Sequence, residues 1–417
     1  MNFTLIPMRH PTPSQPLDSV RRDPLAPPCL RWPLLWAALF ALGSAAAAAA
    51  APFEWETATP ESQGLSTAQL DAFRDELAPR ATAVLLIVRH DKIVYEWYGK
   101  GTTPKTHLNS ASTAKALVGG MAAAAELTDG FINLNDPAAK YIPQWRDDPV
   151  KSKITLRELG DHTSGLDDAE APEVPGAVPS VMGATHGEMP HERLTGWKGD
   201  FWKRLPVPND PFTISRDIVP ILFPPGTKFS YSNSGIGMLA YALTAALRDA
   251  HAPQTDLRTY LRDRVMRPIG VADEDWEIGY NQTFTVDGLP LQAAWGGAAD
   301  TARALARVAR LMLHQGEWDG RRLLSAEAVH AVTNCSDFGM PGDVSIGWWT
   351  NNKEKWPGVP HDTFYAAGAG HRVVVVIPSL DVIVVRNGTE LSTTEPYGPA
   401  QRKYFFTPMM EALAGAK

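Results

Sequence analysis

Two pairs of short hydrophobic stretches lie near opposite ends of the chain. Residues 83–88 and 93–98 are rich in branched and aromatic side chains and flank a tight turn. Residues 372–377 and 382–386 repeat this arrangement. Hydrophobic runs of this length, bounded by turn-forming residues, are typical of β-hairpins. We therefore expect strands from both ends of the chain to pair into one sheet, and the two ends to pack side by side.

Between these hairpins, apolar residues recur mostly at helical spacing. The Ala-rich stretch 111–128 precedes Gly130, a residue type that commonly ends helices. Residues 166–210 are instead rich in Pro, Gly, His and acidic residues, which predicts a long loop insertion that lines a site. The middle of the chain, roughly 120–300, is predicted to be a helical insertion in an α/β body. Helices are expected from Ser66 onward and over 111–128, 239–248, 302–313 and 401–415.

The start of the chain has the pattern of an export signal. Several arginines precede an apolar stretch at 32–42, and the alanine run at 45–51 offers an A-x-A cleavage site. The apolar stretch is about a dozen residues long, too short for a helix across a bilayer of roughly 30 Å. We expect residues 1–50 to be a signal peptide and residues 51–417 to be a periplasmic or secreted domain without stable membrane insertion. An uncleaved anchor is the alternative.

Charge and cysteine content narrow the possible functions. The 39 basic and 46 acidic side chains give a formal net charge of −7. Because the sequence has no basic block, nucleic acid is not an expected partner. Of the two cysteines, Cys29 lies in the predicted signal, so the mature chain has one thiol and no intramolecular disulfide. The remaining Cys335, in the run Thr-Asn-Cys-Ser, is not expected to be a nucleophile.

The run Ser-Thr-Ala-Lys at 112–115 opens the predicted helix at 111–128. Residues three apart lie on one face of a helix, so the Ser112 hydroxyl and the Lys115 amine can meet. The helix N-terminus adds positive potential for a developing oxyanion, and burial lowers a lysine pKa until the amine is a usable base. The run alone is a weak signal, because a capping serine followed by a solvated lysine has the same letters.

A second run, Tyr-Ser-Asn at 231–233, follows a turn rich in Pro and Gly that can present a loop to a cleft. A tyrosine close to a lysine ammonium has its pKa lowered and can relay protons, so we expect this of Tyr231. Asn233 offers a donor and an acceptor to an ester or amide. An ordinary loop with a packed tyrosine is the alternative for this run alone.

With these two runs in this order, the chain resembles the serine β-lactamase and penicillin-binding protein superfamily, specifically its class C-like branch. That branch also contains esterases, D-aminopeptidases and nylon-oligomer hydrolases. The likeness extends from about Leu65 to Met410. Its supporting runs are His-Thr-Ser-Gly-Leu at 162–166, Gly-Gly-Ala-Ala at 296–299, Gly-Glu-Trp-Asp-Gly at 316–320 and Phe-Tyr-Ala-Ala-Gly-Ala-Gly at 364–370.

The resemblance implies both a fold and a mechanism. The implied fold is an α/β sandwich, an antiparallel sheet flanked by helices with an inserted helical subdomain. Ser112 is the implied acylated nucleophile, with Lys115 and Tyr231 as the proton-transfer pair. Backbone N–H groups of Ser112 and Ala369 would form the oxyanion hole, the substrate is a small ester or amide, and no metal or organic cofactor is required. The implied substrate-binding residues are Asn233, Gly368 and Ala369.

The third motif departs from the family pattern. The family has Lys or His, then Thr or Ser, then Gly, whereas this chain has Ala-Ala-Gly at 366–368. In β-lactamases and peptidoglycan peptidases that cationic position helps to bind the substrate carboxylate, and alanine carries no charge. Arg372 follows six residues later, about 20 Å along an extended strand, so we do not expect it to replace the cation. These residues favour a neutral ester or amide over a penicillin.

Other functions stay open at this point. The chain could be a β-lactamase or a D-amino-acid peptidase, or a catalytically silent protein of the penicillin-binding type that senses a ligand. A pure binder does not need proton-transfer groups, which favours an enzyme. His162 is a further candidate base, although in the resembled family its segment is structural.

Overall fold

Strands β2 (Thr82–Arg89) and β15 (Val382–Gly388), from opposite ends of the chain, are hydrogen-bonded neighbours in one sheet. The computed structural model describes residues 53–170, 191, 194–335, 337, 339 and 341–415. All strand pairs of this sheet are antiparallel except β1 with β3, which confirms the predicted antiparallel sheet. The strand order is β1 (Glu56–Thr57), β3 (Lys92–Tyr98), β2, β15, β14 (Arg372–Ile377), β13 (Phe364–Gly368), β12 (Trp348–Thr350) and β11 (Val344–Ser345).

The helices cover the sheet or form the helical middle of the chain. The helices expected from Ser66 onward and at 302–313 appear at the predicted bounds. The helix expected at 239–248 already begins at Asn233, the one expected at 401–415 is a run of α- and π-helical segments over 397–413, and the one expected at 111–128 begins irregularly. The α-helices are α1 (Thr67–Leu77), α2 (Met121–Asp129), α3 (Leu156–Gly160), α4 (Gly196–Lys203), α5 (Pro211–Asp217), α6 (Asn233–Asp249), α7 (Leu257–Leu261), α8 (Ala302–Leu313), α9 (Ala326–Thr333), α10 (Tyr397–Gln401) and α11 (Thr407–Leu413). Short strands are β4 (Leu108–Asn109), β5 (Trp276–Glu277), β6 (Thr283–Val286), β7 (Leu289–Gln292), β8 (Ala299–Asp300), β9 (Glu317–Trp318) and β10 (Arg321–Arg322).

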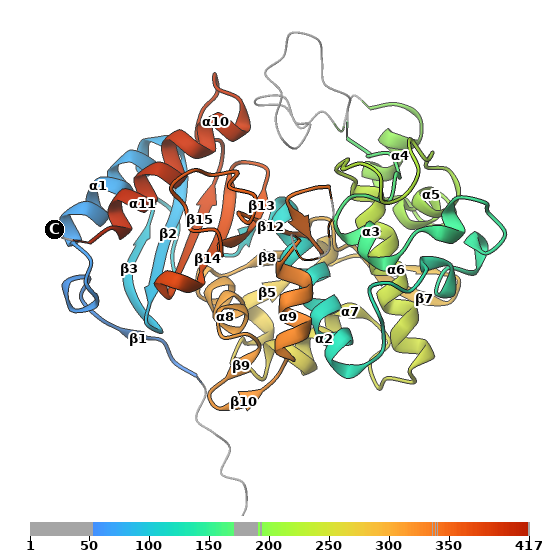
Figure 1. The fold of residues 1–417 in the computed structure, drawn as a ribbon, viewed down its shortest axis with the longest axis horizontal. Coiled ribbons are helices and arrows are strands. Elements are labelled where there is room, and N and C mark those ends of the chain that lie inside the picture. The colour runs from blue at the N-terminus through green and yellow to red at the C-terminus, as the bar shows by residue number, and fades with distance from the viewer. Residues whose placement is uncertain are drawn as a thin grey trace, which may run out of the picture. The chain divides into compact units, whose positions relative to one another are not determined.

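Both faces of the sheet are buried, which explains why its strands are hydrophobic throughout. Along β2, Leu85 and Ile87 pack into the cluster formed with α1 and α11, whereas Val84 and Leu86 point into the cluster that contains α8. This alternation follows from the two-residue period of a strand. Figure 1 shows α1 and α11 side by side against the sheet, which confirms that the two ends of the domain pack together.

The helix predicted at 111–128 begins irregularly. A 3₁₀ turn, Ala111–Thr113, leads into a π-helical turn, Lys115–Gly120, before α2 starts. Gly130 ends α2 in the left-handed conformation, with a φ of 73°, as the sequence predicts. Short π-helical segments are frequent at functional sites, and this one lies directly beside the candidate nucleophile.

The stretch 166–210 is not a loop throughout. Residues 196–203 form α4, in which Trp197 and Phe201 are four residues apart and thus share one face; Phe201 is fully buried. The prediction of a continuous loop is therefore wrong for α4, because its aromatic spacing was hidden among Pro and Gly. Residues 171–190, 192 and 193 of this stretch, and the predicted signal peptide at 1–50, lie outside the described residues.

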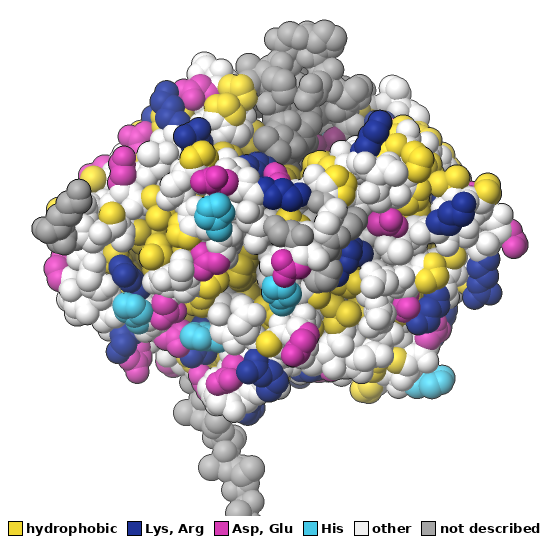
Figure 2. Space-filling view, in the orientation of Figure 1, with side chains coloured by type: hydrophobic (Ala, Val, Ile, Leu, Met, Phe, Trp, Pro, Cys, Tyr) yellow, Lys and Arg dark blue, Asp and Glu magenta, His cyan; other side chains and the backbone are white. Residues whose placement is uncertain are grey.

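On the face drawn in Figure 2, basic and acidic side chains are interspersed, and neither forms a separate charged patch. This distribution agrees with the modest net charge of −7. Within the part of the chain that the structure describes, no helix has both the length and the apolar character needed to cross a membrane.

Candidate active site

Ser112 lies in the 3₁₀ turn that follows β4. The backbone of Ala111 is left-handed, with a φ of 44°, and its N–H donates to Asn109 Oδ1 at 2.8 Å. The Ser110 hydroxyl donates to the Ala111 carbonyl at 2.9 Å and accepts the Ala298 N–H at 3.0 Å. A left-handed non-glycine residue costs on the order of 1–3 kcal/mol and tends to occur at functional sites. These bonds hold the turn and fix the direction of the Ser112 side chain.

An alcohol, an amine and a phenol meet at this turn. The Tyr231 hydroxyl donates to Ser112 Oγ at 2.7 Å, and Lys115 Nζ lies 3.0 Å from the same oxygen. Both distances are within the normal hydrogen-bond range. The structure therefore brings together the three side chains that the sequence predicts to be the nucleophile and the proton-transfer pair.

Lys115 is buried and has three polar neighbours. Besides Ser112, its amine donates to Asn233 Oδ1 and to the Trp295 carbonyl, both at 2.7 Å. Burial lowers the pKa of Lys115 to about 7, as the sequence analysis expects, against the opposite effect of nearby carboxyl groups. An ammonium would use all three protons on these neighbours. A neutral amine donates to Asn233 and Trp295 and directs its lone pair at the Ser112 hydroxyl, which is the arrangement of a base.

The pKa of Tyr231 differs from the expectation. We expected its pKa to be lowered, but burial first, and then the charge of Glu170, raise the pKa of Tyr231 well above its usual value. The Lys115 amine lies 4.7 Å from the centre of the Tyr231 ring, but burial lowers the pKa of Lys115 to about 7, so this amine is neutral at the high pH where the phenol would ionise. Tyr231 is therefore a neutral phenol that can donate a proton and be reprotonated, rather than a phenolate base.

The two rival residues have structural positions. His162 is buried, and its Nδ1 accepts the Ser232 N–H at 3.1 Å while its ring packs 4.6 Å from that of Tyr231. Burial, aided by Lys115, lowers the pKa of His162 to about 3, so it is a neutral acceptor that holds the Tyr231 loop. Cys335 is fully buried beside Thr350, at 3.1 Å from its hydroxyl, and cannot reach a substrate.

The side-chain amide of Asn233 forms hydrogen bonds to other residues of the protein. Its Oδ1 accepts from Lys115, and its Nδ2 donates to Asp168 Oδ1 at 2.9 Å and to Glu170 Oε1 at 3.3 Å. Asn233 is 1% exposed. The structure thus shows a bridge between the base and two carboxyl groups, whereas the role of Asn233 as a substrate ligand stays a prediction.

Asp168 and Glu170 are site residues that the sequence analysis missed. Burial raises the pKa of both carboxyl groups, that of Glu170 to about 8. Asp168 accepts two short hydrogen bonds from Asn233, from the backbone N–H at 2.8 Å and from Nδ2 at 2.9 Å, which favour the anion. We therefore assign the negative charge at neutral pH to Asp168 and the proton to Glu170. Both residues lie within the stretch 166–210 that was predicted to be a loop lining a site, and no motif marks them.

Strand β13 ends directly against the serine turn. A Cβ atom added at Gly368 would lie 2.7 Å from the Ser110 carbonyl oxygen and 3.0 Å from the Ser112 nitrogen, so only glycine fits there. The Tyr397 hydroxyl donates to the Gly368 carbonyl at 3.0 Å. Gly368 and Ala369 are therefore next to Ser112, while an oxyanion hole built from the Ser112 and Ala369 N–H groups stays a prediction.

The position of Arg372 corrects the sequence analysis. We expected about 20 Å between Ala366 and Arg372 along an extended strand. Instead the chain reverses after β13, so Gly368 and Arg372 are paired across a hairpin, and the Arg372 guanidinium donates to the Ala369 carbonyl. Buried Arg386 donates to the next two carbonyls, of residues 370 and 371, at 2.6 and 2.9 Å. These cations support the turn that follows Gly368.

With this geometry established, comparison with known proteins places the chain among its relatives. A sequence model named Beta-lactamase matches residues 70–403. The chain is a member of the β-lactamase family. This confirms the resemblance drawn from the Ser-x-x-Lys and Tyr-x-Asn runs, and membership together with hydrolase relatives makes the chain a serine hydrolase.

Three proteins illustrate what this β-lactamase family member is similar to. It is 26% identical, over 301 residues and 69% of each chain, to a 6-aminohexanoate-dimer hydrolase of Paenarthrobacter ureafaciens. A structure assigned as a 6-aminohexanoate-dimer hydrolase of Bacillus anthracis shares its fold, with a TM-score of 0.63, 18% identity and 87% of each chain covered. A family VIII carboxylesterase also shares the fold, with a TM-score of 0.58 and 16% identity over 85% of this chain and 99% of the other.

Proposed function

We propose that this serine hydrolase cleaves small esters or amides through an acyl-enzyme on Ser112. One observation carries the proposal: Ser112 Oγ lies between the Lys115 amine at 3.0 Å and the Tyr231 hydroxyl at 2.7 Å. A nucleophile within hydrogen-bond reach of both a base and a proton donor is the arrangement that acyl transfer requires.

In the proposed reaction, the neutral Lys115 amine takes the Ser112 proton as Oγ attacks the substrate carbonyl carbon. The carbonyl electron pair moves to its oxygen, and the Ser112 and Ala369 N–H groups stabilise that oxyanion. When the tetrahedral intermediate collapses, Tyr231 protonates the leaving group and recovers a proton from the Lys115 ammonium. Water then attacks the ester on Ser112, with the same groups moving protons in reverse.

The substrate is neutral around the scissile bond. Ala366 and Ala367 place no cation where β-lactamases and peptidoglycan peptidases hold the substrate carboxylate, so the penicillin and D-peptidase alternatives are disfavoured. The names of the relatives, an amide hydrolase and a carboxylesterase, agree with an ester or amide substrate. A ligand sensor without catalysis is disfavoured because both proton-transfer groups contact the serine.

A covalent probe tests the proposal. A fluorophosphonate, followed by peptide mass spectrometry, should label Ser112, and p-nitrophenyl butyrate should be hydrolysed faster than nitrocefin. Ser112→Ala should lose both labelling and turnover, while Ser62→Ala, which changes an exposed serine, should keep them. Full activity in Ser112→Ala would refute the proposed nucleophile. Absence of labelling and of turnover on the ester, nitrocefin and the 6-aminohexanoate dimer would favour the sensor.

The same proposal includes export. The signal-like pattern of residues 1–50 supports it. Expression of the full chain in a bacterium, followed by fractionation and N-terminal sequencing, should yield a periplasmic or secreted product that begins near Ala51. An unprocessed product retained in the cytoplasm would contradict export without affecting the proposed chemistry.

A further inference from the structure

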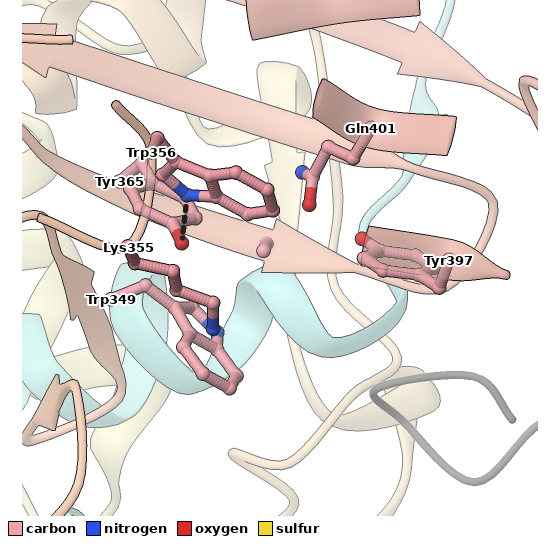
Figure 3. Close-up of a pocket in the computed structure, with 7 residues that line it drawn as sticks. Trp349, Lys355, Trp356, Tyr365, Tyr397 and Gln401 are labelled. Atoms are coloured by element: carbon pink, nitrogen blue, oxygen red, sulfur yellow. Dashed lines mark hydrogen bonds between the residues drawn. The ribbon is translucent and has the colours of Figure 1, made fainter. Parts of the chain in front are cut away.

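The recess beside β13 is too small for a substrate chain. Figure 3 shows the rings of Trp349, Trp356 and Tyr365 packed there, and the Trp356 indole N–H donates to the Tyr365 hydroxyl at 2.8 Å. The cavity among these side chains measures about 10 Å³, which leaves room for about one water molecule. The chain attached to the scissile carbonyl therefore lies elsewhere around Ser112.

Tyr280 lies flat against two glycines of the active-site region. A Cβ atom added at Gly297 would lie 2.3 Å from the Tyr280 ring, and one added at Gly296 would lie 2.7 Å from the Tyr280 hydroxyl oxygen. The ring therefore runs along the glycine backbone, with its hydroxyl over Gly296. The two glycines of the run at 296–299 make room for this tyrosine.

The Tyr280 hydroxyl is thereby close to the catalytic groups. Gly296 follows Trp295, whose carbonyl accepts from the catalytic amine at 2.7 Å. The Cβ position of Gly296 is also 3.6 Å from the carbonyl oxygen of Ala111, the residue before Ser112. The phenol is therefore placed to contact a substrate bound at the serine.

The backbone of Tyr280 is strained. Residues 279, 280 and 281 are all left-handed, with φ values of 65°, 59° and 53°. Glycine and asparagine adopt this conformation readily, whereas tyrosine does not. The Tyr280 N–H donates to the Gly297 carbonyl at 2.7 Å, and nearby Gln282 donates to the Arg204 carbonyl at 3.0 Å. Strain that the surroundings hold in place tends to occur at ligand sites.

Only the hydroxyl edge of the Tyr280 ring is free to contact a ligand. The Arg204 guanidinium lies 4.0 Å from the ring centre, and the Gly297 backbone covers the other face, because two groups this close to one ring cannot share a face. Tyr280 therefore cannot stack on a substrate. Its side chain is partly buried, and its hydroxyl forms no hydrogen bond to any residue that the structure describes.

The Tyr280 hydroxyl is a donor without an acceptor. Burial raises the pKa of Tyr280 to about 12, against the opposite effect of the Arg204 cation, so the phenol is protonated at neutral pH. The Trp295 indole and Arg204 both face the phenol oxygen, but both are donors only and cannot take its proton. Glu170 acts on the phenol through its charge and not through a hydrogen bond. A donor in these surroundings calls for an acceptor on the substrate.

Tyr280 and Tyr231 lie on different sides of Ser112. Tyr231, the proposed proton donor to the leaving group, packs against the apolar cluster that contains Trp349, whereas Tyr280 packs against the cluster that contains Trp276. These two clusters cover opposite faces of the sheet. Because the leaving group faces Tyr231, the acyl chain on the other side of the scissile carbonyl extends toward Tyr280.

We infer that the Tyr280 hydroxyl donates a hydrogen bond to a second, uncharged carbonyl in the acyl chain of the substrate. The inference rests on the proposed acylation of Ser112 and adds a substrate class: esters or amides whose acyl part carries a keto, ester or amide carbonyl a few bonds from the scissile one. A simple alkanoyl ester lacks this acceptor and is the poorer substrate. Arg204 and Gly297 hold the phenol from both faces and are positioning residues.

The test uses two matched pairs of p-nitrophenyl esters, 4-oxopentanoate with pentanoate and 5-oxohexanoate with hexanoate, corrected for spontaneous hydrolysis. In the pair with the larger ratio of keto-ester to plain-ester kcat/KM, this ratio should be about three- to tenfold higher in wild type than in Tyr280→Phe, because phenylalanine keeps the ring but loses one neutral hydrogen bond. Gly296→Ala, whose methyl would displace the hydroxyl, should lower the ratio as well. Tyr404→Phe removes a phenol hydroxyl that donates to Glu395 at 2.6 Å and should keep the wild-type ratio.

The outcomes separate the two proposals, because the ratio divides out any general loss of activity in a variant. If the ratio is the same in wild type, Tyr280→Phe and Gly296→Ala while the plain esters are cleaved, the acceptor site is refuted and the hydrolase stands. A further pair, 2-oxobutyl butyrate and butyl butyrate, carries the second carbonyl in the leaving group. A ratio that depends on Tyr280 only in this pair would overturn the assignment to the acyl chain. If no ester is cleaved and Ser112 is not acylated, the proposed function itself fails.

Discussion

The network behind Lys115 makes a sharp prediction about pH dependence. Replacing Asp168 with Asn removes a negative charge but keeps the shape and an acceptor for the Asn233 N–H, which now lies 2.8 Å from Asp168 Oδ1. A carboxylate near an amine favours the ammonium, so the pKa of Lys115 should fall in Asp168→Asn. Because the reaction needs the neutral amine, the acid limb of the activity profile should move to lower pH.

The magnitude follows from the geometry. Asn233 bridges the two groups, with contacts of 2.7 Å to Lys115 and 2.9 Å to Asp168. The two charges are thus one amide apart, on the order of 6 Å, and at an effective dielectric constant of about 20 to 40 they attract by roughly 1.4 to 2.8 kcal/mol. At 1.36 kcal/mol per pH unit this corresponds to about one to two pH units. The limb should move from near pH 7, the pKa of Lys115 in the native protein, to about 5–6.

The assay is the pH profile of kcat/KM on a neutral nitrophenyl ester, because this profile reports the pKa values of the free enzyme. Glu170→Gln is the matched control. Burial and the charge of Asp168 raise the pKa of Glu170 to about 8, so this group is mostly protonated where the limb lies. Its replacement should move the limb by less than about half a pH unit.

Two results would refute this reasoning. An unchanged acid limb in Asp168→Asn would mean that Lys115 is not the titrating base, or that Asp168 is uncharged. An equal or larger movement in Glu170→Gln would place the negative charge on Glu170 instead. Thermal unfolding of both variants, measured at the same pH values, checks that the compared proteins are folded.

Three further predictions concern the serine turn and its surroundings. Tyr231→Phe should lower kcat on the ester by about 10²–10⁴-fold, because the leaving group loses its proton donor; steady-state kinetics at the pH optimum checks this. Gly368→Ala should lower kcat/KM by about 100-fold or more with little change in secondary structure by circular dichroism, because the new methyl displaces the turn at Ser112. Burial raises the pKa of Asp300 to about 8, so the folded protein keeps a proton that the unfolded chain loses above about pH 4, and stability falls as pH rises from about 4 to 8. Asp300→Asn should therefore shrink the difference in unfolding free energy between pH 5 and pH 8, by up to about 4 kcal/mol; urea unfolding at both pH values measures it.

Local pattern was enough for most of the secondary structure. The helix expected at 302–313 is found as Ala302–Leu313, and both hairpins appear at the expected residues. The hydrophobic pattern did not predict α4, where aromatic residues are mixed with Gly and charged residues. It also did not predict the π-helical turn Lys115–Gly120, where the backbone departs from regular α-helical geometry. The spacing of hydrophobic residues indicates which side of a helix or strand is buried, but it does not indicate which backbone hydrogen-bond pattern a helix adopts.

The chemistry divides in the same way. The sequence runs at 112–115 and 231–233 alone identified the candidate nucleophile, base and phenol, because the chemistry of a side chain follows from its residue type. Only the tertiary structure brought together Ser112 and Tyr231, which are 119 residues apart, and connected Lys115 through Asn233 to Asp168 and Glu170. It also set the direction of the Tyr231 pKa, since a pKa depends on burial and on neighbouring charges that the order of residues does not contain.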